Sequence, residues 1–257
     1  KGAREIAADM GRELGTPCIN NIWVPDGLKD MPANRLLYRE HLRESLDRIF
    51  EKRLDRSLMR DVLEGKVFGI GTESFTVGSH EFYLAYAAGH HVGICMDTGH
   101  YHPTENVADK LSAVVPLIDD VLLHISRGLR WDSDHVLIQG DDLSALMQEM
   151  KRGGFFHQVG MGLDYFDASI NRVAAWVIGL RAAGKAMLTA LLEPSALLEQ
   201  AEADGDFTAR LALTEEFKNL PANAVWEYLC LQEGVPVGTD WLTVLRRYEQ
   251  DVQSKRR

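Results

Sequence analysis

The chain has 257 residues, and its 28 Lys and Arg against 38 Asp and Glu give a net charge of −10 with neutral His. Hydrophobic residues make up 46% and charged residues 26%, which is ordinary globular usage and excludes a disordered tail, a collagen-like fibre and a Cys-rich secreted scaffold. The net acidity argues against a nucleic-acid partner, because counterion release from phosphates needs clustered Lys and Arg. The length fits one large domain, or one domain with a smaller appendage.

The cysteines and the N-terminal segment predict a cytoplasmic protein. The three cysteines, Cys18, Cys95 and Cys230, are odd in number and lack zinc-ribbon spacing, so a reducing compartment is favoured. The first 15 residues are charged and amphipathic, unlike a signal peptide. The longest apolar runs, such as Val173–Leu180, are too short for a membrane span. Because the first residue is Lys, we expect a chain that is processed, truncated or begun partway.

Apolar and helical patterns alternate along the chain. They predict helices at 3–14, 34–60, 82–88, 105–118 and 142–151, and strands at 16–24, 62–70, 91–96, 121–126 and 157–163. After Asp164 the pattern is helical to the end, with breaks near residues 193–194, 204–205 and 236–238.

Strands that alternate with helices predict βαβ units and a parallel sheet. The strands are nearly continuous apolar runs, as expected when both faces of the sheet are covered. Five such units are too few to close an eight-stranded barrel. The fold is therefore either an open doubly wound sheet or the later part of a barrel whose first strands are absent. The helix directly before the first strand, together with the missing Met, favours the second.

Polar residues follow several of these strands, where parallel α/β folds bind ligands. Burying carboxylates at one end of a core is costly unless a cation compensates, so the pattern predicts a metal site. A structural network of ion pairs with nearby Arg and Lys is the alternative. Oxygen-rich ligands with a minority of imidazole and no thiolate suit Mn²⁺, Mg²⁺ or Co²⁺, and about seven ligands suffice for two ions. The residues alone do not choose between Glu64 and Glu73. The candidates are Trp23, Asp26, Glu64, Lys66, Glu73, His80, Asp97, His100, His124, Asp132, Asp134 and Asp164.

Longer motifs resemble one known family. TPCINNIWVPDG, GIGTESFTVGSHEFY, DTGHYHPTE, HISRGLRWDSDHV and GLDYFDASINRVAAWVIG are similar to segments of L-rhamnose isomerase, and the likeness runs through LLEP to the end of the chain. The resemblance implies a xylose-isomerase-like (β/α)₈ TIM barrel, an α/β fold. This chain would cover roughly strands four to eight in residues 1–179, followed by a helical C-terminal extension in residues 180–257. It also implies a homotetramer.

The resemblance further implies roles for individual residues. Trp23 would line the sugar pocket, and Lys66 would polarise the sugar carbonyl. The metal would be Mn²⁺, with Co²⁺, Zn²⁺ or Mg²⁺ as alternatives. The assignment of Glu64 requires a strand that begins near Val62. The structural metal would be held by Glu64, Asp97, His124 and Asp164, and the catalytic metal by His100, Asp132 and Asp134.

The activity implied is an aldose–ketose isomerisation that interconverts L-rhamnose and L-rhamnulose by moving hydrogen between C1 and C2. The hydrogen would move either as a hydride or as a proton through an enediol. Two other functions stay open: a metal-dependent epimerase or lyase of the same superfamily, and an inactive fragment. A barrel that lacks its first strands has two open sheet edges, so we expect this segment to require them.

Overall fold

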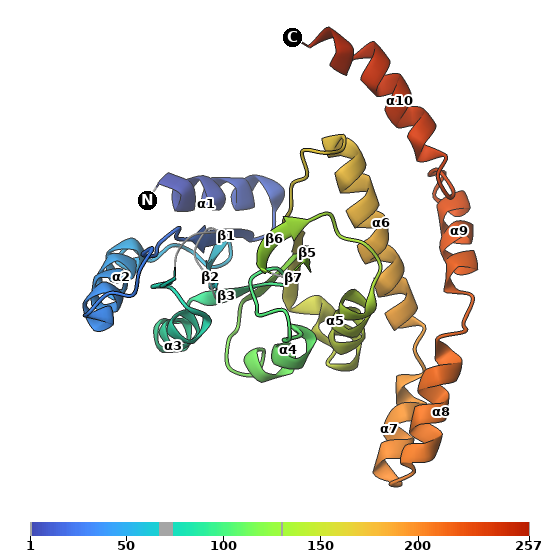
Figure 1. Ribbon diagram of the computed structural model, residues 1–257, viewed down its shortest axis with the longest axis horizontal. Coiled ribbons are helices and arrows are strands. Elements are labelled where there is room, and N and C mark those ends of the chain that lie inside the picture. Colours follow the sequence, from blue (N-terminus) through green and yellow to red (C-terminus); the bar gives the residue numbers. More distant parts are fainter. Residues whose placement is uncertain (1, 67–73, 130, 257) are drawn as a thin grey trace. The chain divides into compact units, whose positions relative to one another are not determined.

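The computed structural model describes residues 2–66, 74–129 and 131–256, with only the backbone described for residue 129 and residues 131–134. The chain forms two compact units. Figure 1 labels the helices and strands of both. The first, Lys1–His135 with Gly154–Tyr165, contains the strands, and the second, Val136–Gly153 with Phe166–Arg257, is helical. The division expected between residues 179 and 180 stays a prediction, and it falls inside a helix.

The first unit is built on a five-stranded sheet. All neighbouring strands are parallel, in the order β1-β2-β3-β4-β7, which confirms the predicted parallel sheet. Because the strands are parallel and in chain order, their carboxyl ends lie along one edge of the sheet. The strands are β1 (Cys18–Trp23), β2 (Met59–Glu64), β3 (Gly93–Asp97), β4 (Val121–Ile125) and β7 (Val159–Leu163).

Helices cover this sheet. Contacts link α1 to β1 and β2, and α3 to β2 and β3. On the face toward α1, the buried guanidinium of Arg4 donates a hydrogen bond of 2.9 Å to the carboxylate of Asp61 in β2. The side-chain amide of Asn20 in β1 donates another, also of 2.9 Å, to the same carboxylate. These two hydrogen bonds compensate the negative charge of Asp61. The helices are α1 (Gly2–Leu14), α2 (Arg35–Phe50), α3 (His80–His90) and α4 (Ala108–Val114), with a 3₁₀ turn at Phe155–His157.

The boundary between α2 and β2 differs most from the sequence-based expectation. The helix predicted over 34–60 ends at Phe50, and β2 begins at Met59 instead of Val62. A turn at Asp55 separates them: its carboxylate accepts hydrogen bonds from the backbone N–H and the hydroxyl of Ser57 at 2.9 and 2.7 Å. Such local side-chain bonds compete with helix formation, and the apolar pattern does not reveal them.

A short antiparallel hairpin was not predicted. It joins β5 (Arg127–Leu129) to β6 (Trp131–His135), with Arg127 opposite His135. Its second strand reads WDSDH, which lacks the apolar alternation that marks a half-buried strand. The hairpin carries Asp132 and Asp134 on a strand instead of an irregular loop.

The second unit contains six α-helices and a 3₁₀ turn at Gln253–Lys255 in the described residues. The break between α8 and α9, at Pro221, was not predicted. Glu193 is buried and accepts two hydrogen bonds from Arg152, at 2.8 and 2.6 Å, which ties the end of α5 to the segment after α6. The helices are α5 (Asp141–Arg152), α6 (Arg172–Leu191), α7 (Ser195–Ala203), α8 (Phe207–Phe217), α9 (Ala222–Gln232) and α10 (Trp241–Asp251).

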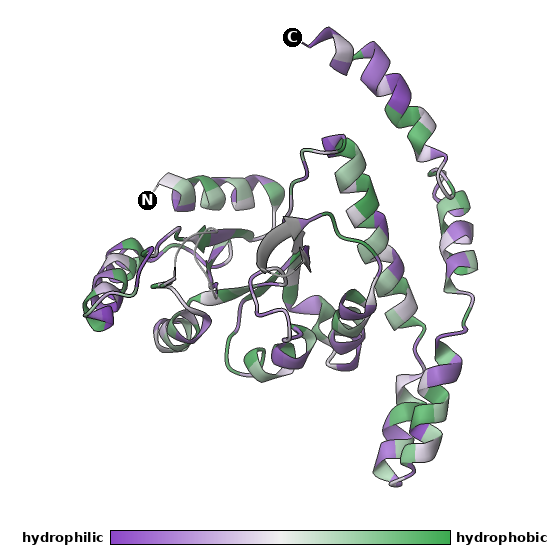
Figure 2. Cartoon of the chain, in the orientation of Figure 1, coloured by the Kyte–Doolittle hydropathy of each residue, from purple (hydrophilic) through white to green (hydrophobic). Residues whose placement is uncertain are grey.

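Helix α6 is longer than the apolar run Val173–Leu180, which the sequence analysis judged too short for a membrane span. It runs for 20 residues and is apolar along much of its length (Figure 2), so by length and composition it passes as a membrane-crossing helix. Its buried positions are small residues, including Ala174, Ala182 and Ala186, and it packs on α5 and α9. Core helices of soluble proteins have the same composition, so the feature is weak evidence for a membrane.

Replacing Gly11 with alanine is expected to destabilise the first unit. A Cβ at this position would lie 1.8 Å from the carbonyl oxygen of Leu58, so α1 would have to move off the sheet. Overpacking of this kind costs about 1–3 kcal/mol, more than alanine gains in helix propensity. The control is Gly89→Ala in α3, where a Cβ meets nothing within 4 Å. Urea denaturation should show a loss for Gly11→Ala alone, and equal midpoints would contradict this packing.

Candidate metal centre

Four potential ligands meet at the carboxyl edge of the sheet. Glu64 and Asp97 are the last residues of β2 and β3, His124 lies in β4, and Asp164 directly follows β7. One ligand atom from each lies within 4.8 Å of all the others. His124 Nδ1 is 3.4 Å from Glu64 Oε2, 3.7 Å from Asp97 Oδ2 and 3.0 Å from Asp164 Oδ2. The four groups therefore surround a common point from four separate strands.

The ionisable groups of this cluster perturb one another strongly. Burial opposes the ionisation of Glu64, but hydrogen bonds with His100, His124 and Asn21 prevail and lower its pKa to about 2. Burial likewise opposes charge on His124, but hydrogen bonds with Asp164, Cys95 and Glu64 raise its pKa to about 12. The Glu64 carboxylate is thus ionised at neutral pH, and the imidazolium of His124 compensates its charge. A divalent cation offers a larger compensating charge to the same oxygens, so the donor set fits a metal.

His100 is held beside the cluster by two further groups. Its Nδ1 lies 3.0 Å from Glu64 Oε1, and its carbonyl oxygen lies 2.9 Å from His80 Nε2. His80 is stacked on Tyr101 with ring centroids 4.0 Å apart, and burial lowers the pKa of its imidazole. A neutral, half-buried His80 therefore fixes the loop that carries His100. It also packs against Gly65, where a Cβ would lie 2.7 Å from its ring nitrogen.

The Asp97 side chain is fixed by the turn that follows β3. Its Oδ1 accepts a hydrogen bond from the backbone N–H of Gly99 at 2.7 Å and lies 3.5 Å from the hydroxyl of Ser126. Thr98 and Ser126 are joined by two hydrogen bonds of 2.9 Å, which lock this turn to the end of β4. Asp97 is fully buried, so its orientation is set before any ligand binds.

A buried lysine lies next to an aromatic ring at the same edge. Lys66 is only 2% exposed, and its Nζ lies 4.7 Å from the centroid of the Trp23 ring. Asp26 is close by: burial raises the pKa of its carboxyl group, and the charge of Lys66 opposes that rise. Burial also raises the pKa of Tyr83 above its ordinary value, with the charges of Asp26 and Glu64 adding to the effect. Lys66 is thus an oriented cation in a largely dry environment.

The structure brings most of the predicted site residues together. Glu64, Asp97, His100, His124 and Asp164 form one cluster, and Lys66 lies against Trp23. Strand β2 runs from Met59 to Glu64, so Glu64 stands at its carboxyl end, the position that its assignment required. Glu73 and the side chains of Asp132 and Asp134 lie outside the described residues, and the individual ligand roles stay predictions.

Sequence reasoning missed two neighbours of Glu64. Asn21 of β1 donates a hydrogen bond from its side-chain amide to the Glu64 carboxylate. Cys95 of β3 stands directly opposite Glu64 in the register and is buried. An Asn inside an apolar strand needs a buried partner, and that signal was available in the sequence. Nothing in the sequence distinguishes Cys95 from an ordinary core residue.

Comparison with known proteins places the chain in a family. The profile of L-rhamnose isomerase matches residues 1–256. The chain belongs to the L-rhamnose isomerase family. The L-rhamnose isomerase of Rhodopirellula baltica is 54% identical over 253 residues, covering 98% of this chain and 59% of that protein. That of Citrobacter koseri is 51% identical over 256 residues, covering 100% of this chain and 61% of that protein.

The match confirms the resemblance inferred from the motifs. The chain spans about three fifths of the length of these curated relatives of the L-rhamnose isomerase family. Among solved structures, a 3-keto-D-glucoside 4-epimerase from E. coli aligns with a TM-score of 0.47 and 17% identity, covering 70% of this chain and 67% of that one.

Binding of Mn²⁺ to this family member is expected to release a proton. Because the pKa of His124 is about 12 without metal, its imidazole is protonated at neutral pH and must lose that proton to become a ligand. The apparent Mn²⁺ affinity should then rise about tenfold per pH unit near neutrality. Calorimetry in two buffers of different ionisation enthalpy measures the proton count. His124→Gln should abolish the release and the exposed His41→Gln should keep it, and binding without proton release in the parent would contradict the assignment.

Proposed function

We propose that this chain provides the metal-binding half of an L-rhamnose isomerase, a metal-dependent aldose–ketose isomerase that interconverts L-rhamnose and L-rhamnulose. The observation that carries the proposal is the convergence of Glu64, Asp97, His124 and Asp164 from four strands at one edge of the sheet. Family membership supports the substrate and the reaction.

Two groups of residues would hold the metals. Glu64, Asp97, His124 and Asp164 would hold one divalent cation, and His100 with Asp132 and Asp134 a second. Bound there, such cations lower the pKa of a sugar hydroxyl and polarise the neighbouring carbonyl. We propose Mn²⁺ as the natural ion, with Co²⁺, Zn²⁺ and Mg²⁺ as alternatives, because the donors are mostly oxygen. Glu64 also orients the ring of His100, as second partners of ligating histidines do.

Lys66 and Trp23 would act on the sugar itself. The ammonium of Lys66, fixed against the Trp23 ring, would donate a hydrogen bond to the C1 carbonyl oxygen and stabilise the charge that develops there. Burial strengthens this interaction, since few waters compete with it. The indole of Trp23, which is 36% exposed, would offer a flat apolar surface to the open-chain sugar.

A direct assay tests the proposal. The protein, extended to the length of its curated relatives, is incubated with L-rhamnose and Mn²⁺, and L-rhamnulose is measured. Formation of the ketose supports the isomerase. An epimerised aldose or a cleaved sugar would instead support another metal-dependent reaction of the superfamily. In deuterated water, little solvent deuterium in the product indicates a hydride shift, and extensive incorporation indicates an enediol.

We also propose that the complete protein is a cytoplasmic homotetramer that requires further barrel strands. Among the described residues, β1 and β7 each pair with one neighbour, so both edges of the sheet are available to further strands. Large apolar side chains are exposed on the helices of the second unit, including Leu180, Phe207, Leu211 and Tyr228. Exposed apolar surface of this kind marks interfaces. Light scattering of the extended chain tests the subunit number, and a monomer would contradict it.

A further inference from the structure

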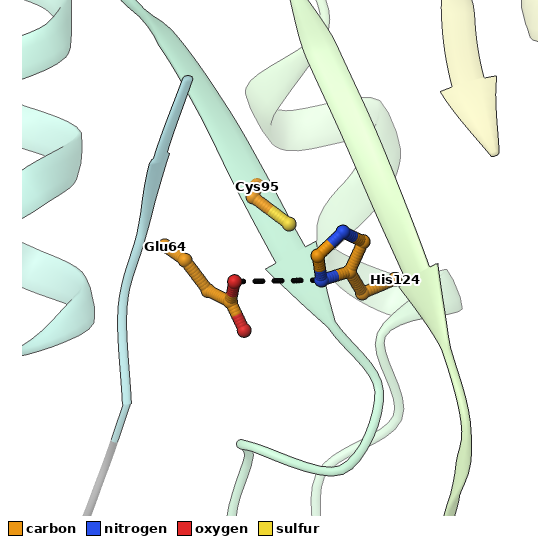
Figure 3. A group of neighbouring side chains, drawn as sticks. All are labelled: Glu64, Cys95 and His124. Atoms are coloured by element: carbon orange, nitrogen blue, oxygen red, sulfur yellow. Dashed lines mark ion pairs between the residues drawn. The ribbon is translucent and has the colours of Figure 1, made fainter. Parts of the chain in front are cut away.

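Cys95 faces the same point as the metal cluster. It lies two residues before Asp97 on β3, so both side chains emerge on one face of the sheet. Glu64 stands opposite Cys95 in the register of β2 and β3, and His124 stands opposite Asp97 in that of β3 and β4. Figure 3 shows the sulfur of Cys95 directed toward the space between Glu64 and His124. One ligand atom from each of these three residues lies within 4.8 Å of the other two.

Glu64 and His124 therefore belong to two overlapping groups. In one group, Asp97 and Asp164 supply carboxylate oxygens as further ligand atoms. In the other group, Cys95, two residues before Asp97 on β3, supplies a sulfur atom. Cys95 is 1% exposed and packs with Val62, Leu122 and Ile19. This apolar layer closes the site on the side away from the carboxyl edge of the sheet. An ion bound to the sulfur would therefore be shielded from water.

The Cys95 thiol has no evident role as a nucleophile. It is 1% exposed and packs among apolar side chains, and buried structural cysteines of this kind are inert. A soft divalent cation can still displace the thiol proton when it binds, because thiolate is the preferred ligand of such ions. The metal–sulfur bond then replaces the S–H bond, and the metal–nitrogen bond replaces an N–H bond of the His124 imidazolium. Both protons leave to the buffer.

We propose that Glu64, Cys95 and His124 form an additional cation position, selective for soft divalent ions such as Cd²⁺ and mutually exclusive with the oxygen-rich position at Asp97 and Asp164. The inference rests on the proposed metal site only in sharing Glu64 and His124. Since one imidazole and one carboxylate serve both positions, a soft ion in the deeper position removes two ligands from the upper one. Cd²⁺ thus becomes an inhibitor that competes with Mn²⁺.

Spectroscopic titration of the metal-free protein, extended to family length, tests this inference without any activity assay. Adding Cd²⁺ is expected to produce a sulfur-to-cadmium charge-transfer band in the near ultraviolet, and excess Mn²⁺ is expected to remove it. Cys95→Ser should lose the band and bind Cd²⁺ at least about tenfold more weakly, while its Mn²⁺ affinity stays within about threefold. Cys18→Ser and Cys230→Ser are matched controls that should keep the band.

Three results would overturn the inference: a band that persists in Cys95→Ser, a band that Mn²⁺ cannot remove, or equal losses of Cd²⁺ and Mn²⁺ affinity in Cys95→Ser. If that variant does not fold, the cadmium NMR shift of the parent protein decides, because sulfur ligation moves the signal strongly downfield. An oxygen-only shift would refute the deeper position. A protein that binds Cd²⁺ through sulfur yet fails to isomerise L-rhamnose would refute the proposed function and leave this inference intact.

Discussion

Replacing Glu64 with glutamine is expected to lower kcat/KM for L-rhamnose by more than about 100-fold. Mutation of a residue that only supports a metal ligand already lowers metal affinity or activity by about 10- to 100-fold. Glu64 contacts His100 and His124 and accepts a hydrogen bond from Asn21, so its charge organises both proposed metal positions. Glutamine keeps the size of the side chain but removes the negative charge. Steady-state kinetics and Mn²⁺ titration of the extended chain measure the two effects.

The matched control for Glu64 is Glu44→Gln on α2, the same chemical change at an exposed position. It should leave kinetics and Mn²⁺ affinity unchanged. Thermal unfolding of the metal-free proteins separates binding from folding. If Glu64→Gln kept its Mn²⁺ affinity and its activity, the cluster at the sheet edge would not be the metal site.

Replacing Lys66 with methionine is expected to lower kcat by about 100- to 1,000-fold, the usual loss when one fixed donor to a developing charge is removed. Methionine retains most of the apolar volume against Trp23 but cannot donate a hydrogen bond to the sugar carbonyl. Because Lys66 is not among the proposed metal ligands, Mn²⁺ affinity should change little. Stopped assays of ketose formation with saturating L-rhamnose and Mn²⁺ give kcat directly.

Lys52→Met serves as the control for Lys66, since Lys52 is an exposed lysine whose ion pair with Glu5 lies on the surface. Its kcat should equal that of the parent. A Lys66→Met variant with parental kcat and a raised KM would show that Lys66 binds the sugar without acting on the carbonyl. Loss of Mn²⁺ binding in that variant would place Lys66 in the metal site instead.

The sequence predicted the parallel sheet because its strands are continuous apolar runs separated by helical patterns. It failed where local hydrogen bonds override periodicity, as in the turn at Asp55 that separates the end of α2 at Phe50 from the start of β2 at Met59. It also missed the hairpin of β5 and β6, since the polar segment WDSDH lacks the apolar alternation of a half-buried strand. These errors concern boundaries and short elements, where pattern signals are weakest.

The site was predicted in kind but not in detail. Acids and imidazoles after successive strands indicated a metal centre, yet the residues alone did not choose between Glu64 and Glu73. The structure places Glu64 at the end of β2, whereas Glu73 lies outside the described residues, so the choice of Glu64 stays a prediction. The presence of Cys95 beside Glu64 depends on the register between β2 and β3.

By itself, then, the sequence determined the order of strands and helices, the parallel arrangement and the chemical character of the site, because these follow from local composition and period. Only the tertiary structure decided which atoms meet: the approach of Glu64, His124 and Asp164, the position of Lys66 over Trp23, and the direction of Cys95 into the cluster. Those contacts join residues far apart in the chain, and strand register and side-chain packing set them.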